Sequence, residues 1–493
     1  MSVQLIIIIL YFIATVVIGV VAGKRAAKSG ASFHGAAMGI FAIVCASTGE
    51  WLGGTATTGV SEYGFDFGLS GAWYTIANGI GVIFLALCFA KLYRSLNTVT
   101  VPGIIGSFLG VNARTVSSVF LTFVMIAVGI SQMIAAGSLG VSLLGLDFNL
   151  VVVVFAVIFI VYTLAGGMAA VASTNVLHLI FMYGGVILAI ILSLGLVGGW
   201  GGFMEGIAEV EAADAAAGTP SSYFNMFSIG MPQVSSWVIA SLLGACTAQA
   251  GIQPVLAAKD VPTAKKACII TAFVVAPFGL FTALLGMVAK VMSHNGALTD
   301  LAGNVVTNGK LALPTLMMHL HPIAGGIVLA SILAAILSTV SPLILASGTM
   351  LTKDLYQGVL RPNATDKQVL TMSRITTAVS GIVCAVVAIL LNSSGIRVLD
   401  IVYFAYSMRG ALFVVVLLGI FYKKTSQKGA IAGMFCTAIV GAIWVIYNGV
   451  MGHYPIPGVS ETYAAVVVAL VSTLIFSAVF PRDPNLKRPE LHY

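Results

Sequence analysis

The stretch Cys45-Ala-Ser-Thr-Gly-Glu-Trp-Leu-Gly-Gly54 places a carboxylate, Glu50, inside a long apolar segment and interrupts that segment with glycine and small polar residues. Of the 39 charged side chains in the chain, only Glu50 and Arg409 lie deep inside such segments. A charge at bilayer depth costs at least ~2.5–3.5 kcal/mol, and such residues usually face an ion or solute pathway. The stretch therefore predicts a membrane transporter with both charges near its working centre.

The composition agrees with a membrane protein. The 493-residue chain is 59% hydrophobic and 8% charged, with a mean hydropathy of +1.06. Soluble domains carry about 25% charged residues, so a soluble fold is excluded. The net charge of +7 would suggest a nucleic-acid partner in a soluble protein, but none is expected here, because the positions of the charges matter more than their sum. The six cysteines all lie in apolar segments and predict no disulfide framework.

Apolar runs of ~18–28 residues can cross a ~30 Å hydrocarbon layer. Thirteen such runs predict an all-α integral membrane protein in the lipid bilayer of the plasma (cell inner) membrane, with spans at 3–22, 38–63, 68–92, 115–143, 149–166, 172–199, 232–257, 267–290, 321–351, 369–391, 398–421, 428–449 and 462–481. The first run is followed, not preceded, by basic residues, which predicts a retained span rather than a cleaved signal peptide.

The basic residues predict the orientation. With an odd number of spans and the N-terminus outside, the C-terminus is cytoplasmic. Three basic residues then lie outside, namely Lys290, Lys310 and Arg397. Nineteen of the 23 lie inside, which the positive-inside rule favours: Lys24, Arg25, Lys28, Lys91, Arg94, Arg114, Lys259, Lys265, Lys266, Lys353, Arg361, Lys367, Arg374, Lys423, Lys424, Lys428, Arg482, Lys487 and Arg488.

The spans divide into two equivalent halves within a single transporter domain. A leading helix at 3–22 and two trailing helices within 428–481 flank ten spans, five in 38–199 and five in 232–421. Because five is odd, the second half enters the membrane from the opposite side. The first span of each half is rich in glycine and small residues at its middle, at Ser47–Gly54 and Gly244–Gly251. Paired interrupted helices in inverted halves predict a transporter with a binding site at the membrane midplane; the alternative is that the small residues only allow close helix packing.

Several runs resemble the sodium:solute symporter family, whose members carry sugars, proline, pantothenate, sialic acid and other organic solutes. The similar runs are Tyr162-Thr-Leu-Ala-Gly-Gly-Met-Ala-Ala-Val171 followed by Thr174-Asn-Val-Leu-His178, Gln253-Pro-Val-Leu-Ala-Ala-Lys-Asp260, Ala334-Ala-Ile-Leu-Ser-Thr339 with Lys353-Asp-Leu-Tyr356, and Leu418–Lys424 with Lys428-Gly-Ala-Ile-Ala-Gly433. The resemblance implies a LeuT-type five-plus-five inverted repeat, in agreement with the two halves above.

A partly dehydrated Na⁺ needs oxygen ligands, which in membranes come from carbonyls at a helix break and from neighbouring hydroxyls. Ser338 and Thr339 are the candidate hydroxyls, and the resemblance adds the carbonyl of Ala335. Ala46 and Gly49 supply the candidate carbonyls at the first break. The alternative is that both hydroxyls only bond to their own helix. Where some relatives hold a second Na⁺, this chain has Asn175 and Ser341-Pro342, which predicts one Na⁺ per cycle.

The resemblance places the solute beside the two broken helices. The candidate solute ligands are Thr48, Glu50, Trp51, Gln132, Gln249, Gln253, Tyr403, Tyr406 and Arg409. Gln249 and Gln253 are four residues apart and share a helix face, and Tyr403, Tyr406 and Arg409 form one stripe at three-residue steps. Aromatic stripes usually serve packing, but this one ends in a buried arginine.

Glu50 and Arg409 have two functional interpretations. In the first, Arg409 binds a carboxylate and Glu50 binds an amine, so that the solute is a zwitterion. In the second, the two side chains pair with each other, as a gate or as a purely structural pair, because a state without solute must also avoid two bare charges. Pairing is the preferred interpretation, with a neutral or anionic solute.

These features predict Na⁺-coupled uptake of a small organic solute by alternating access, in a chain that functions as a monomer. Bound Na⁺ would raise the affinity for the solute by linkage, and the membrane potential would favour its entry. A proton-coupled carrier using Glu50 is the main alternative. An intramembrane enzyme would need a cluster of catalytic groups at helix depth, whereas only Glu50 and an isolated His178 are available. A channel would be expected to show a repeated filter sequence.

Overall fold

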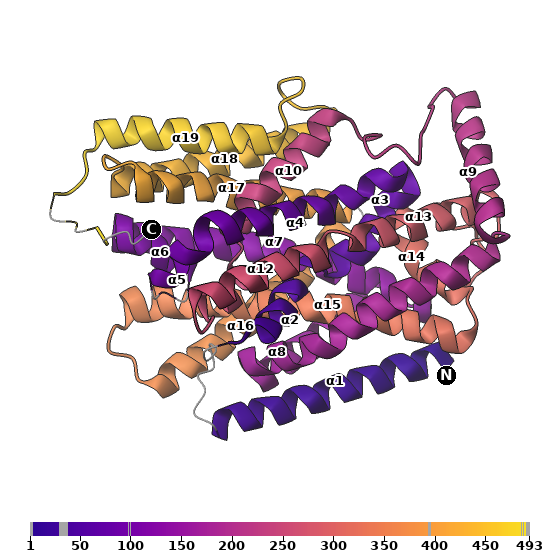
Figure 1. The fold of residues 1–493 in the computed structure, drawn as a ribbon, viewed down its shortest axis with the longest axis horizontal. Helices are drawn as coiled ribbons and strands as arrows, with labels where there is room; N and C mark the ends of the chain where they lie inside the picture. The colour runs from indigo at the N-terminus through magenta and orange to yellow at the C-terminus, as the bar shows by residue number, and fades with distance from the viewer. Residues whose placement is uncertain are drawn as a thin grey trace.

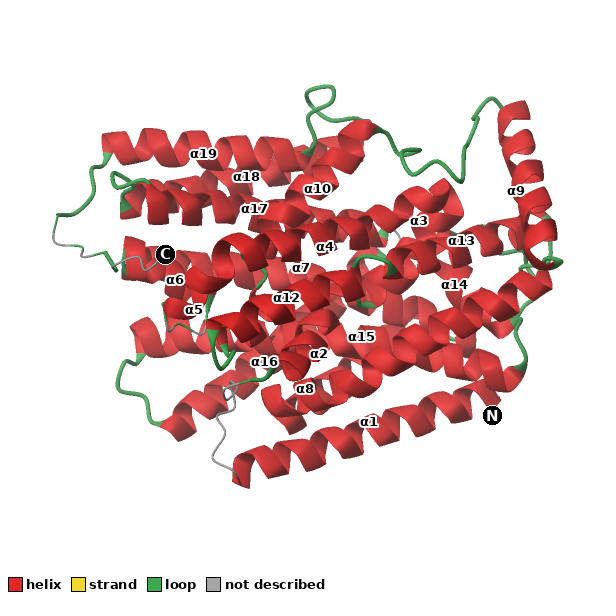
Figure 2. Cartoon of the chain, in the orientation of Figure 1, coloured by secondary structure: helices red, strands yellow, loops and turns green. Residues whose placement is uncertain are grey.

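The protein is helical throughout in the computed structural model, which describes residues 3–28, 38–96, 98, 100–392, 396–484, 486, 488 and 489. Within its helices, the side chains of residues 23–28, 165–172 and 449–450 are not described. The side chains of Lys24, Arg25, Lys28 and Lys487, and most of the 162–171 run, therefore lie outside the described residues. Figure 2 shows helices and loops in the described chain, and β-pairing there is limited to two isolated bridges.

The elements follow one another along the chain as α1 Val3–Lys28, α2 Ile40–Trp51, η1 Thr55–Gly59, α3 Val60–Phe67, η2 Gly68–Ala72, α4 Trp73–Phe84, η3 Leu85–Phe89, α5 Ala90–Ser95, α6 Val101–Leu109, α7 Val111–Leu144, α8 Phe148–Leu196, α9 Gly199–Ala216, α10 Met231–Ala245, α11 Gln249–Leu256, α12 Val261–Val275, α13 Phe278–His294, α14 Gly309–Met318, α15 Pro322–Met350, η4 Leu351–Leu360, α16 Asp366–Leu391, α17 Val398–Phe421, α18 Gln427–Met451 and α19 Glu461–Val479. Here η1, η3 and η4 are π-helical and η2 is a 3₁₀ turn.

The described chain contains eleven helices that are long and apolar enough to cross a membrane, and two shorter apolar helices, Ile40–Trp51 and Phe148–Leu164. The predicted all-helical membrane fold is therefore confirmed, while the count of thirteen spans stays a prediction. Helix assignment runs through α8 from Phe148 to Leu196, yet Tyr162 Oη lies 2.5 Å from Thr174 Oγ1. Because residues twelve apart in a straight helix are separated by about 18 Å along its axis, the chain reverses direction between Tyr162 and Thr174. This reversal agrees with two separate spans at 149–166 and 172–199.

The connection at 200–231, between the predicted spans 172–199 and 232–257, contains the helix α9. Its acidic residues exclude it from a membrane span, yet it lies against α13 and α8, and Phe203, Gly206, Ile207 and Val210 are buried. Helix α9 was not predicted, because its sequence lacks the hydropathy of a membrane span.

The helix α15 lies at the centre of the bundle and contacts α8, α7, α1, α16 and α2. In the most apolar 18-residue stretch of Pro322–Leu360, 94% of residues are buried, against 22% in Val3–Ala22. In Figure 1, α1 runs along one long edge of the molecule, whereas α18 and α19 lie along the opposite edge. The other helices thus lie between α1 on one side and α18 and α19 on the other, and the exposed apolar side chains of these three helices suit contact with lipid.

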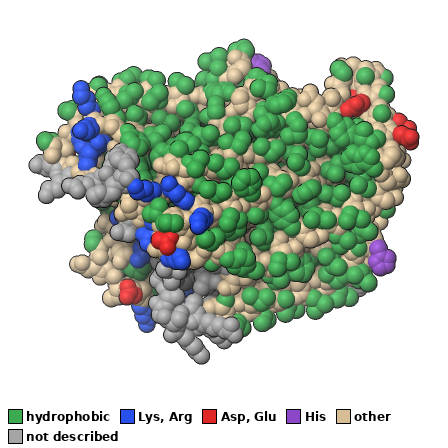
Figure 3. Space-filling model, in the orientation of Figure 1, with side chains coloured by type: hydrophobic (Ala, Val, Ile, Leu, Met, Phe, Trp, Pro, Cys, Tyr) green, Lys and Arg blue, Asp and Glu red, His purple; other side chains and the backbone are tan. Residues whose placement is uncertain are grey.

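The exposed charged side chains in this view lie at the two ends of the bundle. Figure 3 shows Lys and Arg gathered, with some acidic side chains among them, at the end that carries α5 and α6, and acidic side chains on α9 at the other end. The broad surface between the two ends is largely hydrophobic in this view. This polarity supports the predicted cytoplasmic position of the C-terminus, which stays a prediction.

Candidate functional site

The first half of the core contains a true helix break. The α-helix α2 ends at Trp51, and residues 52–54 separate it from the π-helical turn η1. A Cβ on Gly53 would lie 2.4 Å from Thr339 Oγ1, and one on Gly54 would lie 2.7 Å from the Cβ of Ala135. The two glycines therefore let α15 and α7 approach the broken backbone closely. The break falls at the C-terminal end of the predicted stretch, so Glu50 lies in the last turn of α2, just before it.

Gln132 of α7 stabilises this break. Its Oε1 accepts a hydrogen bond from Gly54 N at 2.7 Å, and its Nε2 donates to Thr55 Oγ1 at 2.8 Å. Thr55 Oγ1 also lies 3.0 Å from Ser131 Oγ. Gln132 was predicted as a solute ligand; the structure places it at the expected break and occupies its amide with the backbone and Thr55.

We expect Gln132→Leu to lower the free energy of unfolding by about 1–3 kcal/mol, because the buried N–H of Gly54 loses its acceptor. Thermal unfolding of the purified protein measures this change. The control is Ser118→Ala in the same helix, since the buried Ser118 hydroxyl has no hydrogen-bond partner in the described structure. Equal stability of the two variants would contradict this role of Gln132.

A second helix break lies between the end of α10 at Ala245 and the start of α11 at Gln249. Thr247 Oγ1, in the break, donates to the carbonyl oxygen of Arg409 at 2.6 Å, and Tyr93 Oη donates to that of Cys246 at 2.9 Å. A Cβ on Gly251 would lie 3.1 Å from the indole of Trp51 and 3.3 Å from Glu50 Cγ. The two breaks therefore meet around Glu50 and Arg409.

Glu50 and Arg409 form an ion pair in which Arg409 Nη1 lies 3.3 Å from Glu50 Oε1. Both side chains are fully buried. The centre of the guanidinium lies 3.5 Å from the ring centroid of Tyr406 and 5.2 Å from that of Trp51. The pair keeps either charge from being stranded in the low-dielectric interior, and the two rings hold the plane of the guanidinium by cation–π attraction.

The predicted aromatic stripe of α17 continues into a buried cluster. Tyr406 Oη lies 3.0 Å from Tyr74 Oη of α4, and the Tyr403 ring stacks on Trp237 of α10 with centroids 4.3 Å apart. Tyr403 therefore packs against a helix, whereas Tyr406 contacts Arg409 directly. Tyr74 and Trp237 were not predicted, because they come from segments that are distant from α17 in the sequence.

The five predicted cation ligands lie where α2 and α15 meet. The Thr339 hydroxyl donates to the carbonyl oxygen of Gly49, in the last turn of α2, where carbonyls lack helical partners. The Ser338 hydroxyl donates to the Ala335 carbonyl at 2.8 Å. Asn175 Nδ2 of α8 approaches the Ala46 carbonyl at 3.5 Å. Thr339 thus bonds across to the break, while Ser338 bonds within its own helix, as the alternative to a cation site supposed.

The glutamines of α11 and Thr48 differ in their surroundings. Gln249 Oε1 accepts a hydrogen bond from Val101 N at 2.7 Å and so joins α11 to the start of α6. The side-chain amide of Gln253 and the hydroxyl of Thr48 are buried without a hydrogen-bond partner in the described structure. Gln253 and Thr48 therefore remain candidates for polar contacts with a solute, whereas Gln249 binds the backbone at the start of α6.

Residues 33–437 match the family model described as the Sodium:solute symporter family. The chain belongs to the sodium:solute symporter family. The symporter is 28% identical to the high-affinity proline transporter PutP of Bacillus subtilis over 397 residues, which cover 77% of this chain and 79% of that protein. It is 26% identical to a sodium/glucose cotransporter of Vibrio parahaemolyticus over 392 residues, which cover 76% of this chain and 72% of that protein.

Solved structures agree on the fold. A Na⁺-coupled sialic acid symporter aligns with a TM-score of 0.74 at 19% identity, covering 98% of this chain and 99% of that one. The nucleobase-cation-symport-1 family transporter Mhp1 aligns with a TM-score of 0.58 at 14% identity, covering 92% and 95%. Family membership makes the protein a transporter rather than an enzyme, with Na⁺ as its coupling ion, and its fold is LeuT-like.

The symporter is closed between α3 and the start of α17, at the end that carries α9. Arg397 Nη2 lies 3.1 Å from Asp66 Oδ2, and the Tyr63 hydroxyl donates to Asp400 Oδ1 at 2.6 Å. Glu62 Oε2 accepts from Val398 N at 3.1 Å. These contacts hold α3, which follows the first helix break, against the start of α17.

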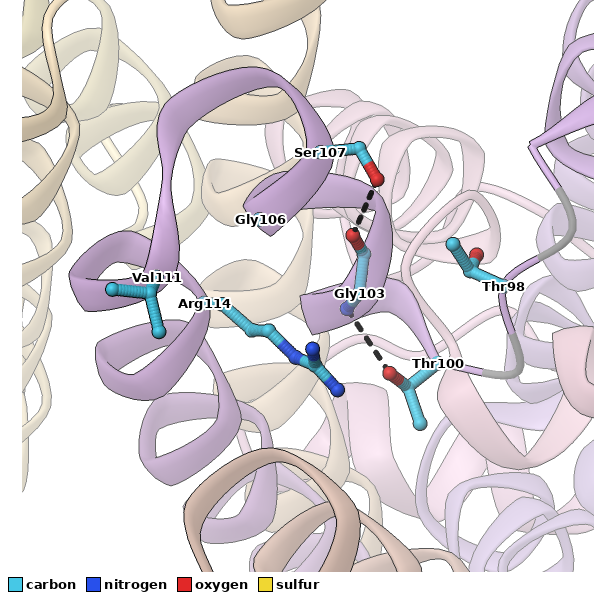
Figure 4. Close-up of a pocket in the computed structure, with 7 residues that line it drawn as sticks. All are labelled: Thr98, Thr100, Gly103, Gly106, Ser107, Val111 and Arg114. Atoms are coloured by element: carbon cyan, nitrogen blue, oxygen red, sulfur yellow. Dashed lines mark hydrogen bonds between the residues drawn. The ribbon is translucent and has the colours of Figure 1, made fainter. Parts of the chain in front are cut away.

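The opposite, basic end of the symporter has a hollow of about 500 Å³, shown in Figure 4. Its lining residues are Thr98, Thr100, Gly103, Gly106, Ser107, Val111 and Arg114. Arg114 and Thr100 both bind Asp354 Oδ1, at 2.6 Å and 3.3 Å. This carboxylate belongs to the Lys353–Tyr356 run of the family resemblance, and here it fastens η4 to α6 and α7.

Proposed function

We propose that this symporter takes up a small organic solute together with one Na⁺ per cycle, by alternating access. The observation that carries the proposal is the bond from the Thr339 hydroxyl to the Gly49 carbonyl, beside the first helix break. A Na⁺ that inserts among Ala46, Gly49, Ala335, Ser338 and Thr339 would join the broken helix to α15 and fix its shape. The solute site lies one residue further along α2, at Glu50, so the two ligands are linked.

The neighbouring positions support a single cation. Asn175 carries no charge and directs its amide nitrogen to the Ala46 carbonyl, and Pro342 offers no hydroxyl. The two breaks support a division into the halves 38–199 and 232–421, because each interrupts the first helix of its half. We further propose that the thirteen predicted spans form one monomeric transporter, with its N-terminus outside and its C-terminus in the cytoplasm.

The solute class follows from Glu50 and Arg409, and a carboxylate-bearing or zwitterionic compound suits them best. The relatives named as proline and glucose transporters show how widely the cargo varies in this family. The ion pair also bears on the proton-coupled alternative, because Glu50 already has a fixed positive partner in Arg409. A titrating carboxylate would have to break that pair in each cycle.

Uptake into proteoliposomes tests the coupling ion. We expect labelled solute, from a panel that includes proline, glucose, lactate and sialic acid, to accumulate only with an inward Na⁺ gradient. Monensin, which dissipates that gradient, should reduce uptake to the level of protein-free vesicles. Accumulation driven by a pH gradient in choline would overturn Na⁺ coupling and favour the proton-coupled carrier.

A further inference from the structure

The buried guanidinium of Arg409 is only partly used by the protein. Its Nη1 donates to Glu50 Oε1, whereas Nε and Nη2 have no hydrogen-bond acceptor among the described residues. Nε and Nη2 form one edge of the guanidinium, with two parallel N–H groups that match the two oxygens of a carboxylate. Buried charged donors are normally satisfied, so an open edge in a fully buried arginine indicates a missing partner.

This open edge lies between the two helix breaks. Thr247, in the second break, holds the backbone of Arg409, and Gly251 lies against Glu50 just before the first break. Discontinuous helices in transporters of this kind of fold surround the solute. The unused donors therefore lie at the place where a cargo is expected, rather than in a packing defect at the periphery.

Gly244 of α10 packs closely against the same edge. A Cβ at this position would lie 2.9 Å from Arg409 Nε and 3.0 Å from its Cγ, closer than ordinary contacts allow. Gly410, which follows Arg409 in α17, offers a contrast. A Cβ on Gly410 would lie 3.4 Å from the Cβ of Leu243, which is an ordinary contact distance. A side chain at position 244 would therefore crowd the open edge of Arg409, whereas a side chain at position 410 would not.

We propose that the Nε–Nη2 edge of Arg409 binds a carboxylate of the transported solute while Glu50 stays bound to Nη1. The inference rests on the proposed Na⁺ symport and names the solute class of that site. It unites the two interpretations of the charges, since pairing and solute binding use different nitrogens. Glu50 Oε2, also without a partner in the described structure, is open to an amine or hydroxyl on the same solute.

Thermal-shift titrations of the purified protein test this assignment, in NaCl and in choline chloride. The probes are acid–amide pairs: L-proline with L-prolinamide, L-alanine with L-alaninamide, L-lactate with lactamide, and benzoate with benzamide, together with glucose and myo-inositol. We expect at least one acid to raise the melting temperature in Na⁺, and its amide to have no effect. The responding pair tells whether an amine or hydroxyl is also required.

Variants then locate the carboxylate. Arg409→Lys keeps the charge opposite Glu50 but lacks the fork, and Gly244→Ala places a methyl group against Nε. We expect each to raise the apparent Kd for the responding acid at least about tenfold, whereas Gly410→Ala leaves it unchanged. Four results would overturn the assignment. In the titrations these are an equal response to acid and amide, binding of only the neutral sugars, or no response to any acid in Na⁺. In the variants it is an unchanged affinity for the acid in both Arg409→Lys and Gly244→Ala. A stabilising effect of Na⁺ alone would persist in those cases, which separates failure of the carboxylate from failure of the symport.

Discussion

Replacing Ser338 and Thr339 together by alanine should lower the apparent affinity for Na⁺ about a hundredfold. Hydrogen bonds and similar contacts to charged groups contribute about 1.5–3 kcal/mol each, so two lost hydroxyls remove ~3 kcal/mol or more. Each 1.4 kcal/mol corresponds to a tenfold change in affinity. The Na⁺ dependence of solute uptake, and of thermal stability without solute, measures the loss.

The control for this variant is Ser347→Ala with Thr349→Ala in the same helix. Those hydroxyls are also buried, and each donates at 2.9 Å to a carbonyl of α15 itself. We expect the control to respond to Na⁺ as the unmodified protein does, and Thr339→Ser to keep most of the response. A double Ser338/Thr339 variant that responds to Na⁺ normally would show that both hydroxyls only serve their helix.

Removing one charge of the central pair should be strongly destabilising. Breaking a buried ion pair leaves an uncompensated charge and costs about 3–5 kcal/mol. We therefore expect Glu50→Gln and Arg409→Gln each to lower the free energy of unfolding by that amount, and the double variant to recover much of it. Unfolding in a denaturing detergent, analysed as a double-mutant cycle, gives the coupling free energy.

The pair between Arg397 and Asp66 provides the comparison. Its side chains are 38% and 28% exposed, and exposed pairs contribute about 0.2–1 kcal/mol. We expect Arg397→Gln to lower the free energy of unfolding by only about 0.2–1 kcal/mol. Two results would show that Glu50 and Arg409 do not compensate each other's charge. One is a loss of unfolding free energy in Glu50→Gln that is as small as the loss in Arg397→Gln. The other is a loss in the Glu50/Arg409 double variant that equals the sum of the losses in the two single variants.

The sequence was sufficient to predict the features that depend on residue type at membrane depth. The interruptions around Leu52 and Thr247, the meeting of Glu50 with Arg409, and the Thr339 hydroxyl at Gly49 are all present in the structure. Their placement could be anticipated because buried charges and glycine-rich breaks in apolar helices are costly, and so have few structural explanations. The binding roles of these residues stay predictions.

The contacts that complete the site could not be predicted, because they depend on side-chain direction between distant segments. Gly244 was seen only as part of a small-residue run, and its position against Arg409 Nε appears once α10 and α17 are packed. Gln132 and Gln249 are polar groups inside apolar helices, which suggested solute ligands, yet their amides bind backbone N–H groups. Freed backbone at a break needs such partners as much as a solute does.

Equilibrium binding of radioactive ²²Na⁺ to the purified protein tests the central claim most directly, because it requires no knowledge of the solute. The account predicts saturation at one Na⁺ per chain, loss of that binding in the Ser338→Ala, Thr339→Ala double variant, and its retention in the Ser347→Ala, Thr349→Ala control. Saturation at two Na⁺ per chain, or undiminished binding in the Ser338/Thr339 variant, would contradict a single sodium site between α2 and α15.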